Sequence, residues 1–371
     1  MPLPPWKRAV IKVGSNLIAP DGGALSTRYL LGIARFIADA RADGRELVLV
    51  SSGAVAAGRA ALGIAPGQRG DVVARQALAA VGQVRMMEAW SKLLDCPCAQ
   101  VLLTHADIGH RRRFVNAKNT LRELLALGAL PVVNENDSVA IDELKLGDND
   151  NLAAHVAVLV EADLLLILSD VDGLFDADPR HLATAQLIER VVNIDASIHA
   201  LAGGVGSSQG TGGMRTKIEA AEKAARRGIA TVIANGRKAE VLASLARGQN
   251  PGTLFCAMAT AVSAKAHWLK HALPAQGTVI VDAGAARALR ERGASLLPPG
   301  VIDVRGHFRA GDAVDMVAID SGGERHVARG ISQYDASELL RIRGHTSQQI
   351  AALLGYVGSA VVVHRDDLVL L

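Results

Sequence analysis

The sequence predicts an α/β fold in which helices sandwich a mostly parallel β-sheet, followed by a small C-terminal β-barrel-like domain. Half of the 371 residues are hydrophobic but only 3% are aromatic, so the core must be aliphatic, as is typical of buried parallel strands. Short β-rich runs alternate with longer helical patterns as far as Phe255, which favours strand–helix–strand units. Beyond that point the strands become short and glycine turns become frequent, which is typical of a small barrel.

The individual elements follow from the apolar runs and their spacing. Strands are predicted at residues 9–13, 47–50, 99–103, 130–133, 164–168 and 230–234, and helices at 26–43, 71–94, 116–127, 151–160 and 214–227. The second domain is predicted to hold strands at 277–281, 301–305, 315–319 and 324–330, with helices at 283–292 and near 347–354. The predicted domains are therefore 1–260, a linker at 261–276, a C-terminal domain at 277–360 and a tail or strand at 361–371.

Charge and composition narrow the functional class. The formal net charge is only +3, and from Gly277 onward ten arginines stand against eleven acidic residues with no lysine, which argues against nucleic acid as the main partner. The N-terminus lacks the apolar stretch of a signal peptide, and no run suits a membrane span. Cys96, Cys98 and Cys256 form no C-x-x-C or zinc set, so we expect structural, reduced cysteines. These observations predict a soluble, cytoplasmic protein.

Two lysine motifs with glycines indicate phosphate chemistry. Lys12-Val13-Gly14-Ser15 closes the first predicted strand, and Gly210-Thr211-Gly212-Gly213-Met214-Arg215-Thr216-Lys217 opens a predicted helix. Glycine lets backbone N–H groups approach an anion, and lysine adds a compact positive charge. Lys12 could instead extend to solvent or pair with a carboxylate, and Lys217 could be a solvated helix-face residue. Neither motif fits the P-loop or the dinucleotide pattern, so we predict a phosphoryl-transfer enzyme with a different nucleotide cradle.

Dense polar runs lie between the two lysines. Asn134-Glu135-Asn136-Asp137 and Gly147-Asp148-Asn149-Asp150-Asn151 could each be a turn with a helix cap, since Asp and Asn favour both. Two such runs, with Asp142 and Glu143 between them, bring together more carboxylates than turns need. Cations must offset the repulsion between these like charges. Mg²⁺ carried by a nucleotide and the amino group of a substrate would supply such cations.

Smaller signals complete the candidate site. The small residues from Ser51 to Gly58 could serve close packing alone or bind an anionic substrate. Ser169-Asp170 ends a strand and suits a nucleotide base and ribose. No G-x-S-x-G or H-E-x-x-H motif occurs. His105 and His110 flank Asp107 beside an arginine-rich loop at 111–113, which we interpret as a solvated basic surface.

With these residues in place, the chain resembles the glutamate 5-kinases (γ-glutamyl kinases) of the amino acid kinase family, which carry a C-terminal PUA domain. The resemblance is nearly full length. It rests on Lys12, Ser51-Ser52-Gly53-Ala54, both polar runs, Gly210-Thr211-Gly212-Gly213-Met214 with Lys217, and the closing Gly355-Tyr356 and His364-Arg365-Asp366-Asp367. The paired Asn-Glu-Asn-Asp and Gly-Asp-Asn-Asp-Asn runs are its most specific part.

The resemblance implies a role for each matching residue. Lys12 and Lys217 would stabilise the transferring phosphoryl group, Asp150 would orient both lysines, and these three are the predicted catalytic residues. The predicted substrate-binding residues are Ser52, Gly53, Asn134, Asp137 and Asn149. The predicted ATP-binding residues are Lys12, Gly14, Ser169, Asp170, Thr211, Gly212, Gly213, Met214, Arg215, Thr216 and Lys217. Mg²⁺ is expected with ATP, and no protein metal site is predicted.

The resemblance also implies a reaction and its partners. Members make L-glutamyl 5-phosphate from ATP and L-glutamate, the first step of proline biosynthesis, and are feedback-inhibited by proline as dimers or tetramers. Contact with glutamate-5-semialdehyde dehydrogenase, which would take the reactive product, is a further hypothesis. Kinases of acetylglutamate, aspartate or a nucleoside monophosphate stay open as alternatives, although the appended barrel and the Asn-Glu-Asn-Asp run argue against them. RNA binding by the C-terminal domain is an alternative of another class.

Overall fold

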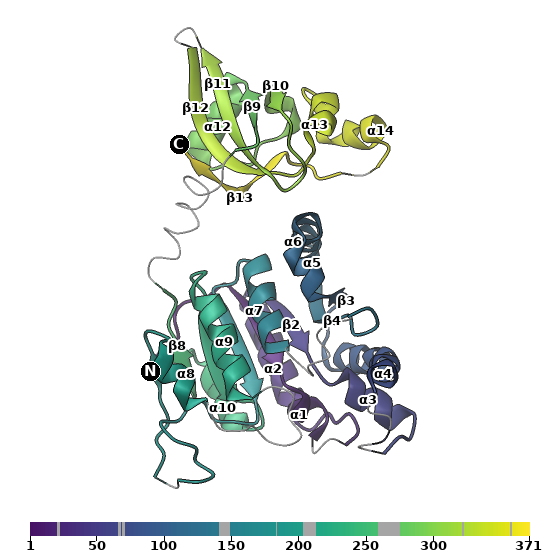
Figure 1. The fold of residues 1–371 in the computed structure, drawn as a ribbon, viewed down its shortest axis with the longest axis vertical. Coiled ribbons are helices and arrows are strands. Elements are labelled where there is room, and N and C mark those ends of the chain that lie inside the picture. Colours follow the sequence, from purple (N-terminus) through teal and green to yellow (C-terminus); the bar gives the residue numbers. More distant parts are fainter. Residues whose placement is uncertain are drawn as a thin grey trace. The chain divides into compact units, whose positions relative to one another are not determined.

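The structure of the protein is a computed structural model that describes residues 1–20, 23–65, 68, 71–140, 149–182, 184–202, 213–258, 275–320, 323–356 and 358–371. The chain forms two compact units, Met1–Ala261 and Val262–Leu371 (Figure 1). Several predicted features lie outside the described residues, namely Gly210, Thr211 and Gly212 of the second lysine motif, Asp142, Glu143, Gly147, Asp148 and most of the linker.

The first unit contains the predicted, mostly parallel sheet. Its strands are β1 (Arg8–Val13), β2 (Glu46–Ser51), β3 (Cys98–Leu103), β4 (Leu130–Glu135), β5 (Leu164–Ser169), β6 (Arg190–Val191), β7 (Ala230–Asn235) and β8 (Thr253–Phe255), in the order β3-β4-β2-β1-β5-β7-β8-β6. Every neighbouring pair is parallel except β7 and β8. Because β1 has β2 on one side and β5 on the other, the strand order reverses at β1. In open α/β sheets, ligands bind beyond the carboxyl ends of the strands at such a point.

Helices cover both faces of this sheet, as predicted. They are α1 (Ser15–Ile18), α2 (Leu30–Ala42), α3 (Ala54–Ala61), α4 (Val72–Leu93), α5 (His105–Gly109), α6 (Arg111–Ala126), α7 (Asn149–Leu159), α8 (Ala196–Leu201), α9 (Met214–Ala225) and α10 (Ala239–Ala246). One aliphatic core lies between the sheet and α2, α4 and α10, and a second lies between the sheet and α6, α7 and α9. Among the described residues, no helix combines the length and apolar composition needed to cross a membrane.

Two helix starts differ from the predictions. Helix α2 begins at Leu30 rather than at Ser26, because Ser26 and its neighbours form a turn in which the Ser26 hydroxyl accepts a hydrogen bond from the Arg28 N–H. Helix α6 begins at Arg111, so the predicted arginine loop is wrong and these residues form the first turn of the helix. Arginine is a good helix former. Arg113 also pairs with Asp107 at 3.1 Å.

The second unit forms its own five-stranded sheet. Its strands are β9 (Gly277–Val281), β10 (Val301–Gly306), β11 (Ala313–Asp320), β12 (Gly323–Ser332) and β13 (Val363–Leu370), in the order β10-β9-β11-β12-β13. Helices α12 (Ala283–Arg292) and α13 (Ala336–Ile342) pack with them around a core that includes Phe308 and Tyr334. The helix predicted near 347–354 is divided into η4 (Ser347–Gln349) and α14 (Ile350–Leu354). Strand β13 pairs with β12, so the C-terminal residues belong to this sheet.

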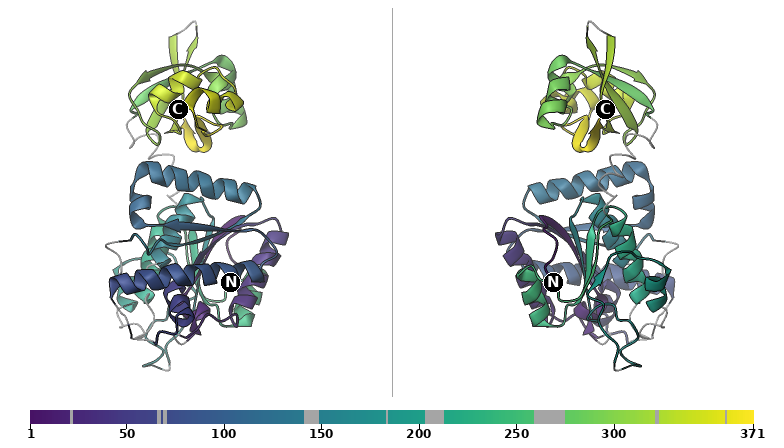
Figure 2. Two further views of the ribbon diagram at one scale, coloured as in Figure 1. Left: turned by 90° about the vertical axis from the view of Figure 1, so that its right-hand side faces the viewer. Right: turned by 90° about the vertical axis from the view of Figure 1, so that its left-hand side faces the viewer.

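Helices α3 and α4 touch through their backbones at two glycines. A Cβ atom on Gly58 would lie 1.8 Å from the carbonyl oxygen of Leu78, and one on Gly82 would lie 1.7 Å from that of Ala54. Figure 2 shows α4, in dark blue, as one long continuous helix. The glycine contact therefore fixes α4 against the first turns of α3, which follow directly from the end of β2.

We expect Gly82→Ala to lower the free energy of unfolding of the first unit by about 3 kcal/mol, because forcing an atom into a closed contact displaces backbone. Urea unfolding followed by tryptophan fluorescence measures this, since Trp90 on α4 is fully buried. Gly109→Ala is the matched control, because a Cβ at Gly109 would meet nothing within 4 Å. Equal stability of the two variants would contradict the close contact.

Candidate functional site

The predicted site residues that the structure describes gather at one edge of the first sheet. Lys12 lies near the end of β1, Ser52 follows the end of β2, and Asn134 and Ser169 lie at the ends of β4 and β5. Helix α7 begins at Asn149 and Asp150, and helix α9 begins just after Gly213. Parallel strands bring all their carboxyl ends to the same edge, which explains how residues far apart in the sequence meet here.

Asp150 holds the two predicted catalytic lysines together. The Nζ atom of Lys12 lies 2.6 Å from Asp150 Oδ1, and the Nζ atom of Lys217 lies 3.3 Å from Asp150 Oδ2. The hydroxyl of Thr216 donates a hydrogen bond of 2.8 Å to the same carboxylate. All three charged side chains are buried, and Asp150 is completely inaccessible to solvent.

Asp150 is shared by two cations. The ammonium groups of Lys12 and Lys217 both contact this one buried carboxylate, one at each oxygen. Burial alone would raise the pKa of Asp150, but the ammonium groups of Lys12 and Lys217 and the hydrogen bonds from Lys12 and Thr216 hold it well below its usual range. Asp150 therefore stays ionised, and the group is suited to receive an anion such as a phosphoryl group.

The predicted substrate-binding amides form a second cluster beside the lysines. The side-chain N–H groups of Asn149 donate to the hydroxyl of Ser52 at 2.8 Å and to the side-chain oxygen of Asn134 at 2.9 Å. These three residues are buried. Gly53, the residue before α3, has a φ of 95°, a left-handed conformation that favours glycine and turns the chain sharply into the helix.

Asp137 follows Asn134 by three residues, and its carboxyl group has a perturbed pKa. Burial raises the pKa of its carboxyl group, and the guanidinium of Arg75 opposes that rise only in part. A cationic group brought by a ligand would favour the ionised form of Asp137.

The predicted nucleotide-binding residues are placed as follows. Asp170, after β5, accepts hydrogen bonds from the side chain of Asn16 at 2.8 Å and from the hydroxyl of Ser169 at 3.1 Å. The N–H of Gly14 donates to the carbonyl of Leu168 at 3.0 Å, so that N–H is engaged within the sheet. Gly213 caps α9, Met214 is half-buried, and Arg215 points to Glu219 on its own helix at 3.6 Å.

The sequence analysis missed two residues of α4 that contact the site. Gln83 accepts a hydrogen bond of 2.9 Å from the side-chain N–H of Asn134, and Trp90 donates one of 2.9 Å to the hydroxyl of Ser51. Both side chains are buried, and they lie seven residues apart on one face of the helix. A glutamine at a core position of an amphipathic pattern was the signal that could have identified Gln83.

Comparison with known proteins decides the family. The model of the amino acid kinase family matches residues 7–235, and the PUA domain model matches residues 277–354. The chain is 54% identical to a glutamate 5-kinase of Xanthomonas campestris pv. campestris (strain 8004), covering 98% of this chain and 100% of that protein. The chain belongs to the amino acid kinase family.

Two further glutamate 5-kinases agree with that membership. A glutamate 5-kinase of Idiomarina loihiensis is 53% identical, and the alignment covers 100% of this chain and 99% of that protein. A glutamate 5-kinase of Salinibacter ruber is 54% identical, and the alignment covers 99% of this chain and 98% of that protein. A solved UMP kinase of Bacillus anthracis aligns at 16% identity and a TM-score of 0.46 over 68% of this chain and 97% of that one. The family resemblance drawn from the sequence is confirmed, as are the parallel sheet and the C-terminal PUA domain.

Asp107 and His105 belong to the start of α5. Asp107, between His105 and His110, forms a capping box with Thr104 at the start of α5. The ring of His105 packs edge-on against that of His155 on α7, with 5.6 Å between the ring centres. Burial lowers the pKa of His155 to about 4, and Lys223, His105 and Arg227 add to the effect by repulsion.

We expect this buried histidine to make stability depend on pH. The pKa of His155 is lower in the folded state than in the unfolded chain, so protonation favours unfolding, and stability falls as the pH drops from about 6.5 towards 4. The contribution is at most about 1 kcal/mol per pH unit, because the side chain is partly exposed. Urea unfolding at pH 7.5 and pH 5.0 should show a smaller difference for His155→Gln than for the wild type, whereas exposed His110→Gln should match the wild type. An unchanged difference in His155→Gln would contradict the expectation.

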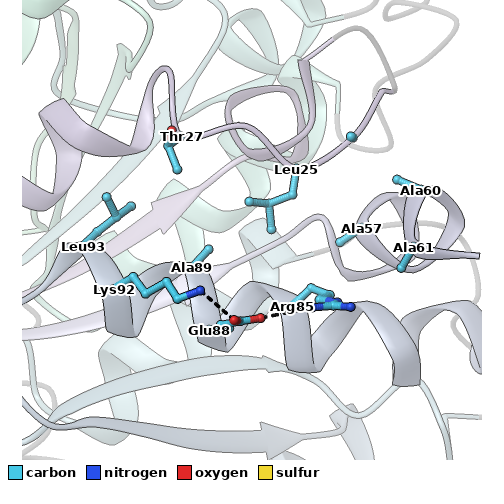
Figure 3. A pocket seen from close by; sticks show the side chains of 11 residues that line it. Leu25, Thr27, Ala57, Ala60, Ala61, Arg85, Glu88, Ala89, Lys92 and Leu93 are labelled. Carbon is cyan, nitrogen blue, oxygen red and sulfur yellow. Dashed lines mark hydrogen bonds and ion pairs between the residues drawn. The ribbon is translucent and has the colours of Figure 1, made fainter.

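A separate hollow of about 460 Å³ lies beside α3 and α4 (Figure 3). Leu25 and alanines of α3 line it, and along α4 Glu88 pairs with Arg85 at 3.3 Å and with Lys92 at 2.7 Å. None of the predicted site residues lines it, and its ion pairs are exposed.

Proposed function

We propose that this kinase transfers the γ-phosphoryl group of ATP to the γ-carboxylate of L-glutamate and forms L-glutamyl 5-phosphate. The observation that carries the proposal is the buried Lys12–Asp150–Lys217 group, in which two ammonium groups share one carboxylate, beside a cluster of buried amides and a hydroxyl suited to a polar substrate. The relatives named glutamate 5-kinase, at 53–54% identity over nearly the whole chain, support glutamate as the acceptor.

The reaction requires the protein mainly to stabilise negative charge. The γ-carboxylate of glutamate has an ordinary pKa of about 4.3 and is ionised at neutral pH, so no general base is needed. Two anions must be brought together while phosphoryl transfer proceeds through a loose, in-line transition state. Lys12 and Lys217 would neutralise the charge on the transferring group, and Asp150 would keep both ammonium groups aimed at it.

The acceptor side offers a counterion for the amino group of glutamate. Asp137 would receive the α-ammonium group, which removes the cost of its own burial. Ser52, Gly53, Asn134 and Asn149 would line the rest of the acceptor site with small side chains and amides. A structure of the complex with glutamate tests this arrangement, and a bound ammonium remote from Asp137 would contradict it.

Mg²⁺ would arrive with ATP. The described residues include no group of three or more His, Cys, Asp or Glu side chains arranged to hold a metal ion. Mg²⁺ in kinases is usually held by substrate phosphates with one or two carboxylates, so the residues present fit an ion carried by the nucleotide. Asp170 would be a carboxylate available at this edge, and Thr211 to Lys217 would approach the phosphates. The ion would neutralise phosphate charge. Activity that survives complete chelation of divalent cations would contradict this role.

The test is a panel of acceptors with Mg-ATP. The protein is incubated with L-glutamate, N-acetylglutamate, L-aspartate and UMP, while ADP is followed and acyl phosphate is trapped with hydroxylamine. Hydroxamate with glutamate alone is the expected result. Turnover of another acceptor without glutamate turnover would keep the family and overturn the substrate.

Further parts of the proposal concern the setting of the reaction. We propose that it is the first step of proline biosynthesis in the cytoplasm, that proline inhibits it, and that the chain works as a homodimer or homotetramer. Added proline in the panel assay tests the inhibition, and sedimentation velocity tests the assembly.

The described cysteines are free thiols, which fits a reducing compartment. Hand-off of the acyl phosphate to glutamate-5-semialdehyde dehydrogenase is tested by co-purification, and release of all product into bulk solvent would count against it.

A further inference from the structure

A line of hydrogen bonds joins α4 to the acceptor side of the site. Gln83 on α4 accepts from Asn134 at 2.9 Å, and Asn134 in turn accepts from Asn149 at 2.9 Å. The exposed fractions of these side chains are 7%, 3% and 5%, so water does not compete for the bonds. Asn134 thus depends on Gln83 for a partner to its amide N–H, since a buried donor without a partner is costly.

The direction of every bond in this line is set at one end. Asn149 donates to the backbone carbonyl of Ser51 at 3.4 Å as well as to the Ser52 hydroxyl. A backbone carbonyl can only accept, so the Asn149 amide must present its N–H groups on that side. Asn134 must then present its oxygen to Asn149 and its N–H group to Gln83, which must offer its oxygen.

The two ends of the line carry unused hydrogen-bonding capacity. Among the described residues, the buried Nε2 of Gln83 and the buried Oδ1 of Asn149 have no hydrogen-bond partner. The interior of the line is therefore fully paired, while a donor is left at the α4 end and an acceptor at the Asn149 end. Unpaired buried polar groups are rare in folded proteins and often belong to functional sites.

We propose that Gln83 is a positioning residue for the acceptor substrate. It acts through Asn134 to hold the Asn149 amide in the orientation that binds the acceptor, while it leaves the lysines and the nucleotide unaffected. The glycine contact at Gly82 places it there, because it fixes the backbone of α4 next to the start of α3. The inference rests on the proposed function, since its readout is the use of glutamate.

The test is a double-mutant cycle on Gln83 and Asn134. Gln83→Met keeps the length of the side chain but removes its amide, and we expect the KM for glutamate to rise about tenfold. The KM for ATP should stay within about threefold of the wild-type value, because the lysine group is untouched. If Gln83 acts only through Asn134, the double variant Gln83→Met/Asn134→Ala should have the same KM for glutamate as Asn134→Ala alone.

Additive effects of the two substitutions would overturn the proposal, as would a rise in the KM for ATP equal to that for glutamate. Gln83→Ala replaces Gln83→Met in the cycle if the latter does not fold. Thr231→Val is the matched control. Like Gln83, Thr231 is buried and has a side-chain polar atom without a hydrogen-bond partner among the described residues. Unlike Gln83, it lies near the start of β7, at the opposite end of that strand from the carboxyl edge of the sheet. Failure of the proposed function is seen separately, because the wild type would then not turn over glutamate at all.

Discussion

Asp150→Asn should lower kcat for glutamate phosphorylation by about a thousandfold, the upper end of what one preorganised electrostatic group contributes. The substitution keeps the shape of the side chain but removes the negative charge that lies 2.6 Å from Lys12 and 3.3 Å from Lys217. The two ammonium groups would then repel each other in a buried place, and their aim at the phosphoryl group would be lost. Steady-state kinetics at saturating glutamate and ATP measures the effect.

The same substitution should also destabilise the first unit by about 3–5 kcal/mol, because it leaves buried charges without a counterion. Glu161→Gln is the matched control, since Glu161 also bridges two cations, Lys118 at 3.3 Å and Arg122 at 2.9 Å, away from the site. That control should keep kcat within about threefold of the wild-type value. A similar loss of kcat in both variants would mean that destabilisation, rather than the charge of Asp150, explains the result.

Lys12→Ala and Lys217→Ala should each lower kcat by about a hundredfold or more while the fold survives. Removal of one lysine leaves the other paired with Asp150, so these two buried ions keep each other as counterions. Either lysine variant should consequently be more stable than Asp150→Asn, although its chemistry is impaired. Thermal unfolding and kcat measured on the three variants test both halves of the expectation.

Lys223→Ala is the control on the same helix as Lys217. Lys223 bonds to the side chain of Asn151 at 2.6 Å and lies outside the predicted site. It should keep kcat within about threefold of the wild-type value. Near-normal turnover in both Lys12→Ala and Lys217→Ala would refute the assignment of the lysines as catalytic residues.

The part of the site that the sequence could predict is the part built from strand ends. Lys12 follows an apolar run, Asp150 opens a helix after a polar run, and Lys217 follows a glycine pair, so each stands at a visible boundary. Parallel strands then bring these boundaries together without any further information. The same reasoning predicted the six main strands, because buried parallel strands are continuous apolar runs.

The parts that escaped prediction depend on contacts between distant segments. In the sequence Gln83 is one polar residue of a helix, with no local pattern that marks it as part of the site. Its hydrogen bond to Asn134 depends on the close contact of α3 and α4 at Gly58 and Gly82. Strand β8 has only the residues Thr253–Phe255 and runs antiparallel to β7, which no local pattern specifies. The start of α6 at Arg111 was missed because a run of three arginines carries no apolar periodicity.

The dependence of the acceptor side on α4 has a consequence for altering substrate choice in the laboratory. Libraries that randomise only the loops at the sheet edge would leave Gln83 and Trp90 unchanged, and with them the amides and hydroxyl that these side chains hold. Variants that accept a different amino acid should therefore be sought by varying loop positions together with positions 83 and 90. Selection at the loops alone would leave unsampled the two helix positions that hold Asn134 and Ser51 through hydrogen bonds.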